Sequence, residues 1–309
     1  MTIERLIIKK SIIWIFTSLF VKTILLCLAT TIVVGFFIYL SPGRVDMTLA
    51  RSNSILHKPT RQYDNFPAFY LRWLGHITSG ELGRTVLGRK VGEELWNKIK
   101  VTGIISFGGA FLSISLAFLF GFYLVARSHY FTMRFALGVL YLLTALPTFF
   151  VGYMFISIIP IKLEGIPGYF IAIIILTFGN GIISEFSFNF AHNLKRELKK
   201  PYMETAFVKG LRNDTVFPLP GTIFYHAVRQ AIILILPRMG LRLSQIVGLS
   251  IIIEKLLDLH GLGDMLLDGL SAKDVNCVLV VILCLTLLIR LMAVLNESLL
   301  YLLNPRMRI

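Results

Sequence analysis

The chain has 309 residues, of which 56% are hydrophobic and 16% are charged, and its mean hydropathy is +0.75. Soluble domains usually contain about 45–50% apolar and about 25% charged residues, so the composition excludes a disordered, fibrous or ordinary soluble protein. The apolar residues fall in runs of roughly 20, which is the length of a membrane-spanning helix. They predict an all-α, multi-pass membrane protein.

The net charge of +14 arises from 31 basic and 17 acidic residues. In a soluble protein this excess would suggest a nucleic-acid partner, but cytoplasmic loops of membrane proteins are also rich in Lys and Arg. We therefore expect contact with membrane lipid and no nucleic-acid partner. The three cysteines lie in or beside apolar runs without metal-binding spacing, so we expect no metal site.

The N-terminal half begins with a mixed segment. Residues 1–22 alternate apolar and basic side chains, which predicts an interfacial or cytoplasmic helix, or the lower end of a longer first span. Residues 23–40 are the first predicted span. Residues 41–100 are polar and predict an extracytoplasmic segment.

The rest of the chain predicts a core transmembrane domain over residues 101–303. Its polar cytoplasmic loop is predicted at 191–230, and a cytoplasmic tail at 304–309. The five spans of this domain are predicted at 101–125, at 135–161, from the end of a turn at 165–168 to about residue 190, at 231–253 and at 276–303.

The distribution of basic residues predicts the orientation of these six spans. With the N-terminus inside, the inner segments hold 14 basic residues and the two short outer loops hold 3. This asymmetry places both termini in the cytoplasm. The 41–100 segment is also basic, but its length is near the limit beyond which the charge rule loses force.

Ionisable residues within spans are the usual sign of an ion or proton path. Glu185 and Glu297 fall toward the predicted inner ends of their spans, where they could reach the interface. A second group, equally consistent with a polar pathway lining or with packing between helices, consists of Pro147, Arg238, Arg242 and Arg290.

No motif for catalysis is present. The segment Gly83–Lys90 comes nearest to a phosphate-binding Walker A loop, but it lacks the required Lys-Ser/Thr ending. We therefore expect no enzyme activity, no catalytic residue and no cofactor bound by this chain.

Residues 201–211 predict a short helix in the cytoplasmic loop. Pro201 suits its first position and Gly210 its end, while Glu204 and Lys209 complement the helix dipole. A helix of about 9 residues is marginal alone, so we expect it to dock on its own protein or on a partner.

This segment resembles the EAA loop of ABC importer permeases, with Glu204, Ala206 and Gly210 in place and Thr205 replacing the middle Ala. Thr205-Ala206-x-x-Lys209-Gly210-Leu211 is similar to the form in the dipeptide, oligopeptide and nickel importers. The other motifs that resemble this family, in the same order and within residues 65–309, are Tyr70-Leu71-x-Trp73-Leu74, Gly80-Glu81-Leu82-Gly83, Leu146-Pro147-Thr148-Phe149-Phe150-Val151-Gly152, His226-Ala227-x-Arg229, Gly240-Leu241, Glu254, Gly261-Leu262-Gly263 and Asn304-Pro305-Arg306-x-Arg308.

The chain also departs from the family pattern. The stretch between Gly210 and His226 is longer by several residues, and a helix-ending proline expected near Leu234 occurs instead at Pro237. These departures affect the expected docking geometry of the 191–230 loop.

The resemblance implies a type I ABC importer permease in a bacterial-type inner membrane. It implies a second homologous permease, an extracytoplasmic solute-binding protein, and two ATP-binding subunits that carry ATP and Mg. Alternating access would be driven through a coupling helix, with Met203 and Phe207 on its buried side and Glu204 and Lys209 at its rim. The full set of implied coupling residues is Met203, Glu204, Thr205, Ala206, Phe207, Lys209, Gly210 and Leu211.

The solute stays open at this point. Family frequency favours di- and oligopeptides, with nickel or another small solute as the alternative. From other classes of protein, a self-contained secondary carrier and an assembly scaffold that has lost transport also stay open.

Overall fold

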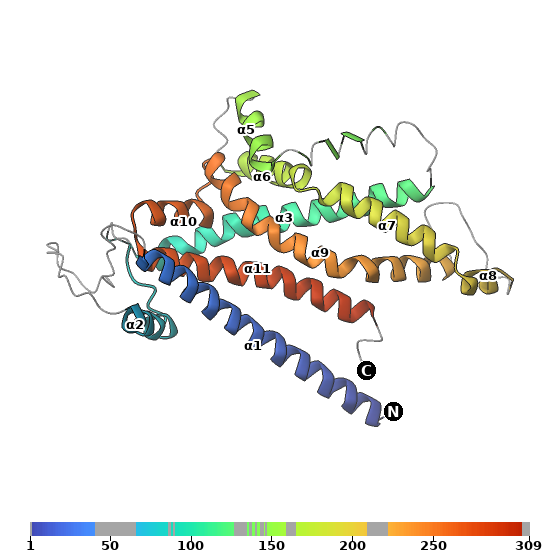
Figure 1. The fold of residues 1–309 in the computed structure, drawn as a ribbon, viewed down its shortest axis with the longest axis horizontal. Coiled ribbons are helices and arrows are strands. Elements are labelled where there is room, and N and C mark those ends of the chain that lie inside the picture. Colours follow the sequence, from blue (N-terminus) through green and yellow to red (C-terminus); the bar gives the residue numbers. More distant parts are fainter. Residues whose placement is uncertain are drawn as a thin grey trace.

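The computed structural model describes residues 2–40, 66–85, 88, 90–126, 135, 138–139, 141–142, 145, 147–158, 165–208 and 222–304. In this part of the chain the regular structure is helical, and one isolated bridge joins Arg84 to Lys90. Long helices run along the length of the molecule; of the shorter ones, some lie toward its two ends and others lie along its upper edge (Figure 1). The all-α prediction agrees with this architecture.

Four of the described helices are long and apolar enough to cross a membrane alone. They are α1 (Thr2–Leu40), α3 (Val91–Ala126), α9 (Thr222–Leu256) and α11 (Val275–Leu303). Residues 2–40 form one helix, of which Thr17–Leu40 has the span-like composition. A run of 24 residues covers about 36 Å at 1.5 Å per residue, enough for the hydrocarbon core of a bilayer.

A fifth crossing is broken. α6 (Ile166–Gly179) and α7 (Ile182–Leu198) pass the same test only as a pair, and their axes differ by 49°. α5 (Thr148–Ile158) is apolar but shorter. Of the third span predicted at 135–161, residues 136–137, 140, 143–144, 146 and 159–161 lie outside the described residues, and α5 covers part of the remainder. The described part therefore holds four or five crossings, against the six that the sequence predicts.

The helices pack pairwise around one core. α3 lies along α7, α9 lies along α11, and α1 reaches the bundle mainly through α11. α2 (Phe66–Thr78) covers one end through two buried aromatic residues: Tyr70 shares a 2.7 Å hydrogen bond with Thr31 of α1, and Trp73 Nε1 donates to Asn276 Oδ1 of α11 at 3.1 Å. These polar contacts fix α2 against both helices, because a buried hydroxyl or indole N–H needs a partner.

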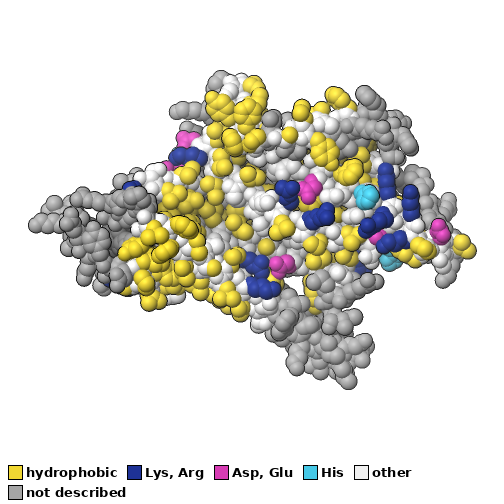
Figure 2. Space-filling view, in the orientation of Figure 1, with side chains coloured by type: hydrophobic (Ala, Val, Ile, Leu, Met, Phe, Trp, Pro, Cys, Tyr) yellow, Lys and Arg dark blue, Asp and Glu magenta, His cyan; other side chains and the backbone are white. Residues whose placement is uncertain are grey.

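The molecule has two distinct ends (Figure 1). α8 (Pro201–Val208), the start of α1 and the end of α11 lie toward one of them, called here the α8 end. α2 and α10 (Leu262–Ser271) lie toward the other, the α10 end. On the face drawn in Figure 2, Lys, Arg and His side chains gather toward the α8 end.

The proline that the family pattern associates with the end of a helix does not end one here, in agreement with the span predicted at 231–253. Pro237 lies inside α9, which continues to Leu256. One turn later Gly240 allows α11 to approach closely, since a Cβ there would lie 2.6 Å from Asn296 Nδ2. Asn296 donates to the Leu236 carbonyl of α9 at 2.9 Å. A polar contact with α11 therefore stabilises α9 beside its proline, where helices commonly kink.

Candidate functional site

The predicted coupling segment forms α8, which carries Glu204 and Thr205 on its exposed side. Met203 is 1% exposed, whereas Val208 is 87% exposed. Met203, which the resemblance places on the buried side of the coupling helix, therefore packs against this chain. Ala206 and Phe207 belong to the helix, but their side chains, like residues 209–211, fall outside the described part of the chain.

α8 is also tied to α7 by polar contacts around one buried carboxylate. Glu197 is 2% exposed; its Oε1 lies 2.7 Å from Lys200 Nζ, and its Oε2 accepts a 3.2 Å hydrogen bond from Tyr202 Oη. Burial and the negative charge of Glu197 raise the pKa of Tyr202, so the phenol stays protonated and keeps donating. The short helix is held to α7 by these polar contacts and to the core by Met203, and displacing it would disturb both.

The break between α6 and α7 shapes the middle of the bundle. Gly181 has φ of 75°, a left-handed conformation that suits glycine. Asn180 donates to Ser113 Oγ of α3 at 3.3 Å and accepts from the backbone N–H of Ile182 at 2.8 Å. Thr148 donates to the Gly179 carbonyl at 2.9 Å. These side chains satisfy backbone groups that the interrupted helix leaves free, as membrane helices require.

A cavity of about 360 Å³ opens beside this break and is called here the α6–α7 cavity. Its lining combines one acid, one base, two amides, a hydroxyl and two aromatic rings. The lining residues are Tyr141, Asn180, Gly181, Ser184, Glu185, Phe188, Asn189 and Arg242.

Glu185 and Arg242 form an ion pair across the cavity. Glu185 Oε2 lies 2.7 Å from Arg242 Nη2, with 31% and 41% of the two side chains exposed. Arg242 also donates to Gln245 at 3.2 Å. A charged side chain at the centre of a bilayer costs about 2.5–3.5 kcal/mol on insertion scales. Half-exposed charges at this depth therefore indicate a surface that faces protein or water instead of lipid.

The other predicted pathway residues divide into different environments. Arg290 is mostly buried: its Nε donates to Thr23 of α1 at 3.2 Å, and its Nη1 lies 3.2 Å from Glu297. It joins α11 to α1, which is the packing interpretation. Arg238 is exposed on α9, and Pro147 precedes α5. Of these four candidates, only Arg242 lines the cavity.

The residues that surround Arg242 were only partly recognised in the sequence. Glu185 was expected near the inner end of its span, but the structure places it in the first turn of α7, beside the break. Asn180, Ser184 and Asn189 were not singled out. The Gly179-Asn180-Gly181 sequence, which punctuates an apolar run, was the signal that could have found them.

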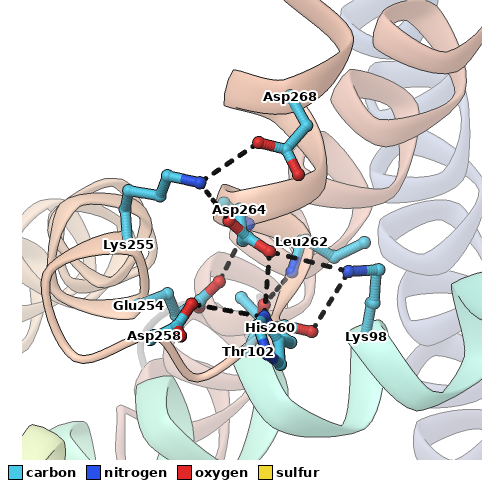
Figure 3. A network of polar contacts seen from close by, with 10 residues as sticks. Lys98, Thr102, Glu254, Lys255, Asp258, His260, Leu262, Asp264 and Asp268 are labelled. Carbon is cyan, nitrogen blue, oxygen red and sulfur yellow. Dashed lines mark hydrogen bonds and ion pairs between the residues drawn. The ribbon is translucent and has the colours of Figure 1, made fainter.

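A second polar cluster, the α10-end network, joins α3, α9 and α10 (Figure 3). It consists of Lys98, Thr102, Glu254, Lys255, His260, Asp264 and Asp268.

Glu254 anchors the start of α10. It is fully buried, and its Oε2 accepts a 2.8 Å hydrogen bond from the Gly263 N–H. Thr102 of α3 accepts from the Leu262 N–H, also at 2.8 Å. A Cβ at position 261 would collide with the Glu254 carboxylate. The Gly261-Leu262-Gly263 sequence therefore allows a carboxylate and a hydroxyl to reach amides of the first helical turn.

Asp264 supplies the charge at the centre of the network. Its Oδ1 lies 2.6 Å from Lys255 Nζ, and its Oδ2 lies 3.3 Å from His260 Nδ1. Burial alone would raise the pKa of Asp264, but the hydrogen bonds from Lys255 and His260 outweigh burial and lower it below its ordinary value. Asp264 stays ionised and holds the α9–α10 connection together.

Among the described residues, no group of three or more His, Cys, Asp or Glu side chains is arranged to hold a metal ion. The described part of the chain thus offers two built polar sites, the α6–α7 cavity and the α10-end network, together with the exposed side of α8.

Comparison with known proteins identifies the family that this chain matches. Residues 107–309 match the family described as binding-protein-dependent transport system inner membrane component. The nickel import system permease protein NikB from Staphylococcus aureus strains USA300 and NCTC 8325 is 22% identical over 250 residues, which cover 80% of this chain and 74% of NikB. NikB from the bovine strain RF122 is similar to the same extent.

Proposed function

Because the chain belongs to the family of binding-protein-dependent transport system inner membrane components, we propose that it forms one half of a solute pathway whose opening is driven through α8. The family consists of multi-pass permease subunits of ABC importers in the bacterial inner membrane. In our proposal the other half is a second, homologous permease. Two ATP-binding subunits, which carry ATP and Mg, dock at the α8 end, and a solute-binding protein docks at the α10 end.

The orientation proposed is six crossings with both termini in the cytoplasm. The gathering of Lys and Arg toward the α8 end supports it (Figure 2), because cytoplasmic segments of membrane proteins are enriched in these residues. The start of α1 and the end of α11 lie toward that same end, which is consistent with an even number of crossings (Figure 1).

The attachment of α8 to α7 is the observation that carries the mechanism. Buried Met203 and Glu197 fix the short helix to the bundle, while Val208 remains exposed for a partner. Closure of the ATP-binding subunits would therefore displace α7 together with α8. Since α7 lies along α3 and α9, this motion would be transmitted to the middle of the pathway.

We expect Val208→Glu to abolish ATP-driven uptake and to reduce recovery of the ATP-binding subunits with the purified permease. The chain should still fold, because the Val208 side chain is 87% exposed. Leu71→Glu is a matched control: Leu71 is 69% exposed but lies on α2, toward the α10 end, so recovery of the ATP-binding subunits should be unchanged. Normal uptake and normal subunit recovery with Val208→Glu would contradict coupling through α8.

ATP dependence separates this proposal from a self-contained carrier and from an assembly scaffold. Uptake into proteoliposomes should require the ATP-binding subunits, ATP and the solute-binding protein. Uptake that survives without ATP would support a carrier, and a complete complex that moves no solute would support a scaffold.

For the solute, we propose di- or oligopeptides, on the resemblance to the dipeptide and oligopeptide importers. Nickel import is the second candidate, because the NikB relatives carry that function in their name. Competition between a labelled dipeptide and ⁶³Ni²⁺ for uptake by the complete complex would distinguish the two.

A further inference from the structure

We propose that the α6–α7 cavity is a transit site for zwitterionic organic solutes, in which Arg242 receives a carboxylate and Glu185 receives an ammonium group. The inference rests on the proposed function and narrows its substrate class. It requires that the cavity be open to the pathway, that its charges be free to exchange partners, and that its size and polarity suit such a solute.

The depth of the cavity places it within the membrane-crossing part of the bundle. Arg242 lies about 26 and 21 Å along the helix from the two ends of the Tyr225–Leu256 span. Its exposed guanidinium and the exposed Glu185 carboxylate are poorly tolerated by lipid at this depth. Water and a polar solute suit this surface, because charges inside membrane proteins usually face a water-filled path or each other.

The charges of this ion pair can exchange partners. Exposed ion pairs contribute little to stability, because water competes for both groups. With 41% of Arg242 and 31% of Glu185 exposed, a solute carboxylate or ammonium can approach either side chain. Replacing the Arg242–Glu185 contact by two contacts to a zwitterion keeps both charges paired.

The remaining lining suits a small organic molecule. Asn180, Ser184 and Asn189 offer amide and hydroxyl groups, and Tyr141 and Phe188 offer aromatic surface. A volume of about 360 Å³ lies within the range of ordinary ligand sites, which is roughly 300–1,000 Å³. Arg242 disfavours a bare cation and Glu185 disfavours an anion, so a solute that carries both charges fits best.

Two sources share this chemistry: short peptides, and aminocarboxylates that chelate a metal. Both present an ammonium or amine beside a carboxylate. The test must therefore include each of them, together with the free metal ion.

The experiment measures protection of a cysteine placed in the cavity. Phe188 is 54% exposed, so Phe188→Cys should react with a maleimide, whereas the native Cys27, Cys277 and Cys284 are buried. Labelling rates are measured on the complete detergent-purified complex, with Ala-Ala, with N-acetyl-Ala-Ala-amide, with Ni²⁺–histidine or with Ni²⁺ alone. We expect saturating Ala-Ala or Ni²⁺–histidine to slow labelling at least threefold, and the blocked dipeptide and free Ni²⁺ to slow it less than 1.5-fold.

Neutral variants test the two charges. In the Phe188→Cys background, Glu185→Gln combined with Arg242→Gln should reduce protection to less than 1.5-fold. The matched control neutralises another exposed ion pair, Lys90 and Glu93, which lie 3.0 Å apart, and should leave protection unchanged. Three kinds of protection would overturn the proposal: equal protection by charged and blocked dipeptides, protection that survives the double Gln variant, and protection by free Ni²⁺ alone. The absence of protection with every solute would also overturn it.

Failure of the transit site and failure of the proposed function give different results. The labelling assay needs no ATP turnover, and ATP-driven uptake is measured separately on the same complex. Normal ATP-driven uptake without cysteine protection would reject only the transit site. Loss of ATP dependence in the uptake assay would reject the importer assignment itself.

Discussion

Two of the clusters of charged side chains in the described part of the chain, the α10-end network and the α6–α7 cavity, differ in what surrounds them. In the α10-end network Asp264 is buried and contacts Lys255 and His260, and a Cβ at the neighbouring Gly261 would collide with the Glu254 carboxylate. In the α6–α7 cavity the Glu185 carboxylate and the Arg242 guanidinium lie at a similar distance from each other, but both side chains are partly exposed. In the first cluster the chain itself supplies the partners of Asp264, whereas the ion pair of the second is accessible to water, a solute or another subunit.

The buried charges of the α10-end network therefore have a structural role, whereas the accessible ion pair of the α6–α7 cavity is available for function. Buried Asp264 contributes to stability through its contacts with Lys255 and His260, because removing these partners would leave a buried charge unpaired. An open ion pair contributes little to stability and can exchange partners. Substitutions in the α10-end network should therefore affect folding, while those in the α6–α7 cavity should affect transport.

The largest effect is expected for Gly261→Val. The new side chain would collide with the Glu254 carboxylate and would lie close to Thr102 Oγ1, which are both fixed by hydrogen bonds to α10. Overpacking of this kind destabilises by about 3 kcal/mol, so the amount of monodisperse protein in detergent should fall several-fold. Gly248→Ala, on α9, is the control, because a Cβ there meets nothing within 4 Å. Equal yields for the two variants would show that the network tolerates strain.

A smaller, pH-dependent effect is expected for Asp264→Asn. Because the folded chain holds the pKa of Asp264 below its ordinary value, the ionised carboxylate adds stability above about pH 4, and this stability is lost as pH falls through the folded-state pKa. The variant should be less stable than the natural chain at pH 7, by about 1–2 kcal/mol. Thermal unfolding in detergent should show the two converging below about pH 4; a gap that stays constant would contradict this role.

The smallest effect on stability is expected for Glu185→Gln with Arg242→Gln. An exposed ion pair is worth about 0.2–1 kcal/mol, and solvent screening of these half-exposed groups favours the lower part of that range. The unfolding midpoint should therefore shift by no more than a few degrees, while solute uptake falls. A loss of stability as large as that of Gly261→Val would instead assign the pair to packing.

The sequence predicted the long helices well, because a bilayer requires continuous apolar runs that are visible without an alignment. The predicted positions of the helix ends were less accurate. α3 begins at Val91, ten residues before the predicted span, because Glu93 and Glu94 are polar yet favourable in a first helical turn. α6 and α7 were expected as one span, since a single Asn between two glycines changes the average hydropathy very little.

The site was harder to predict, because it depends on contacts between distant residues. Arg242 was among the pathway candidates, but its pairing with Glu185 follows from the packing of α7 against α9. Arg290 looked equivalent in the sequence, yet the structure pairs it with Thr23 and Glu297. Periodicity places a residue on a helix face and leaves open which helix covers that face.

The contact between Arg290 and Thr23 has a consequence for the order of synthesis. The two residues are 267 positions apart, and α1 reaches the bundle mainly through α11. At about 5–20 residues per second, a ribosome needs roughly 13–50 s to make the intervening chain. α1 must therefore enter the bilayer early and remain there, surrounded by lipid, until the last helix is translated. The packing of α1 against α11 is completed only after the final helix has been translated.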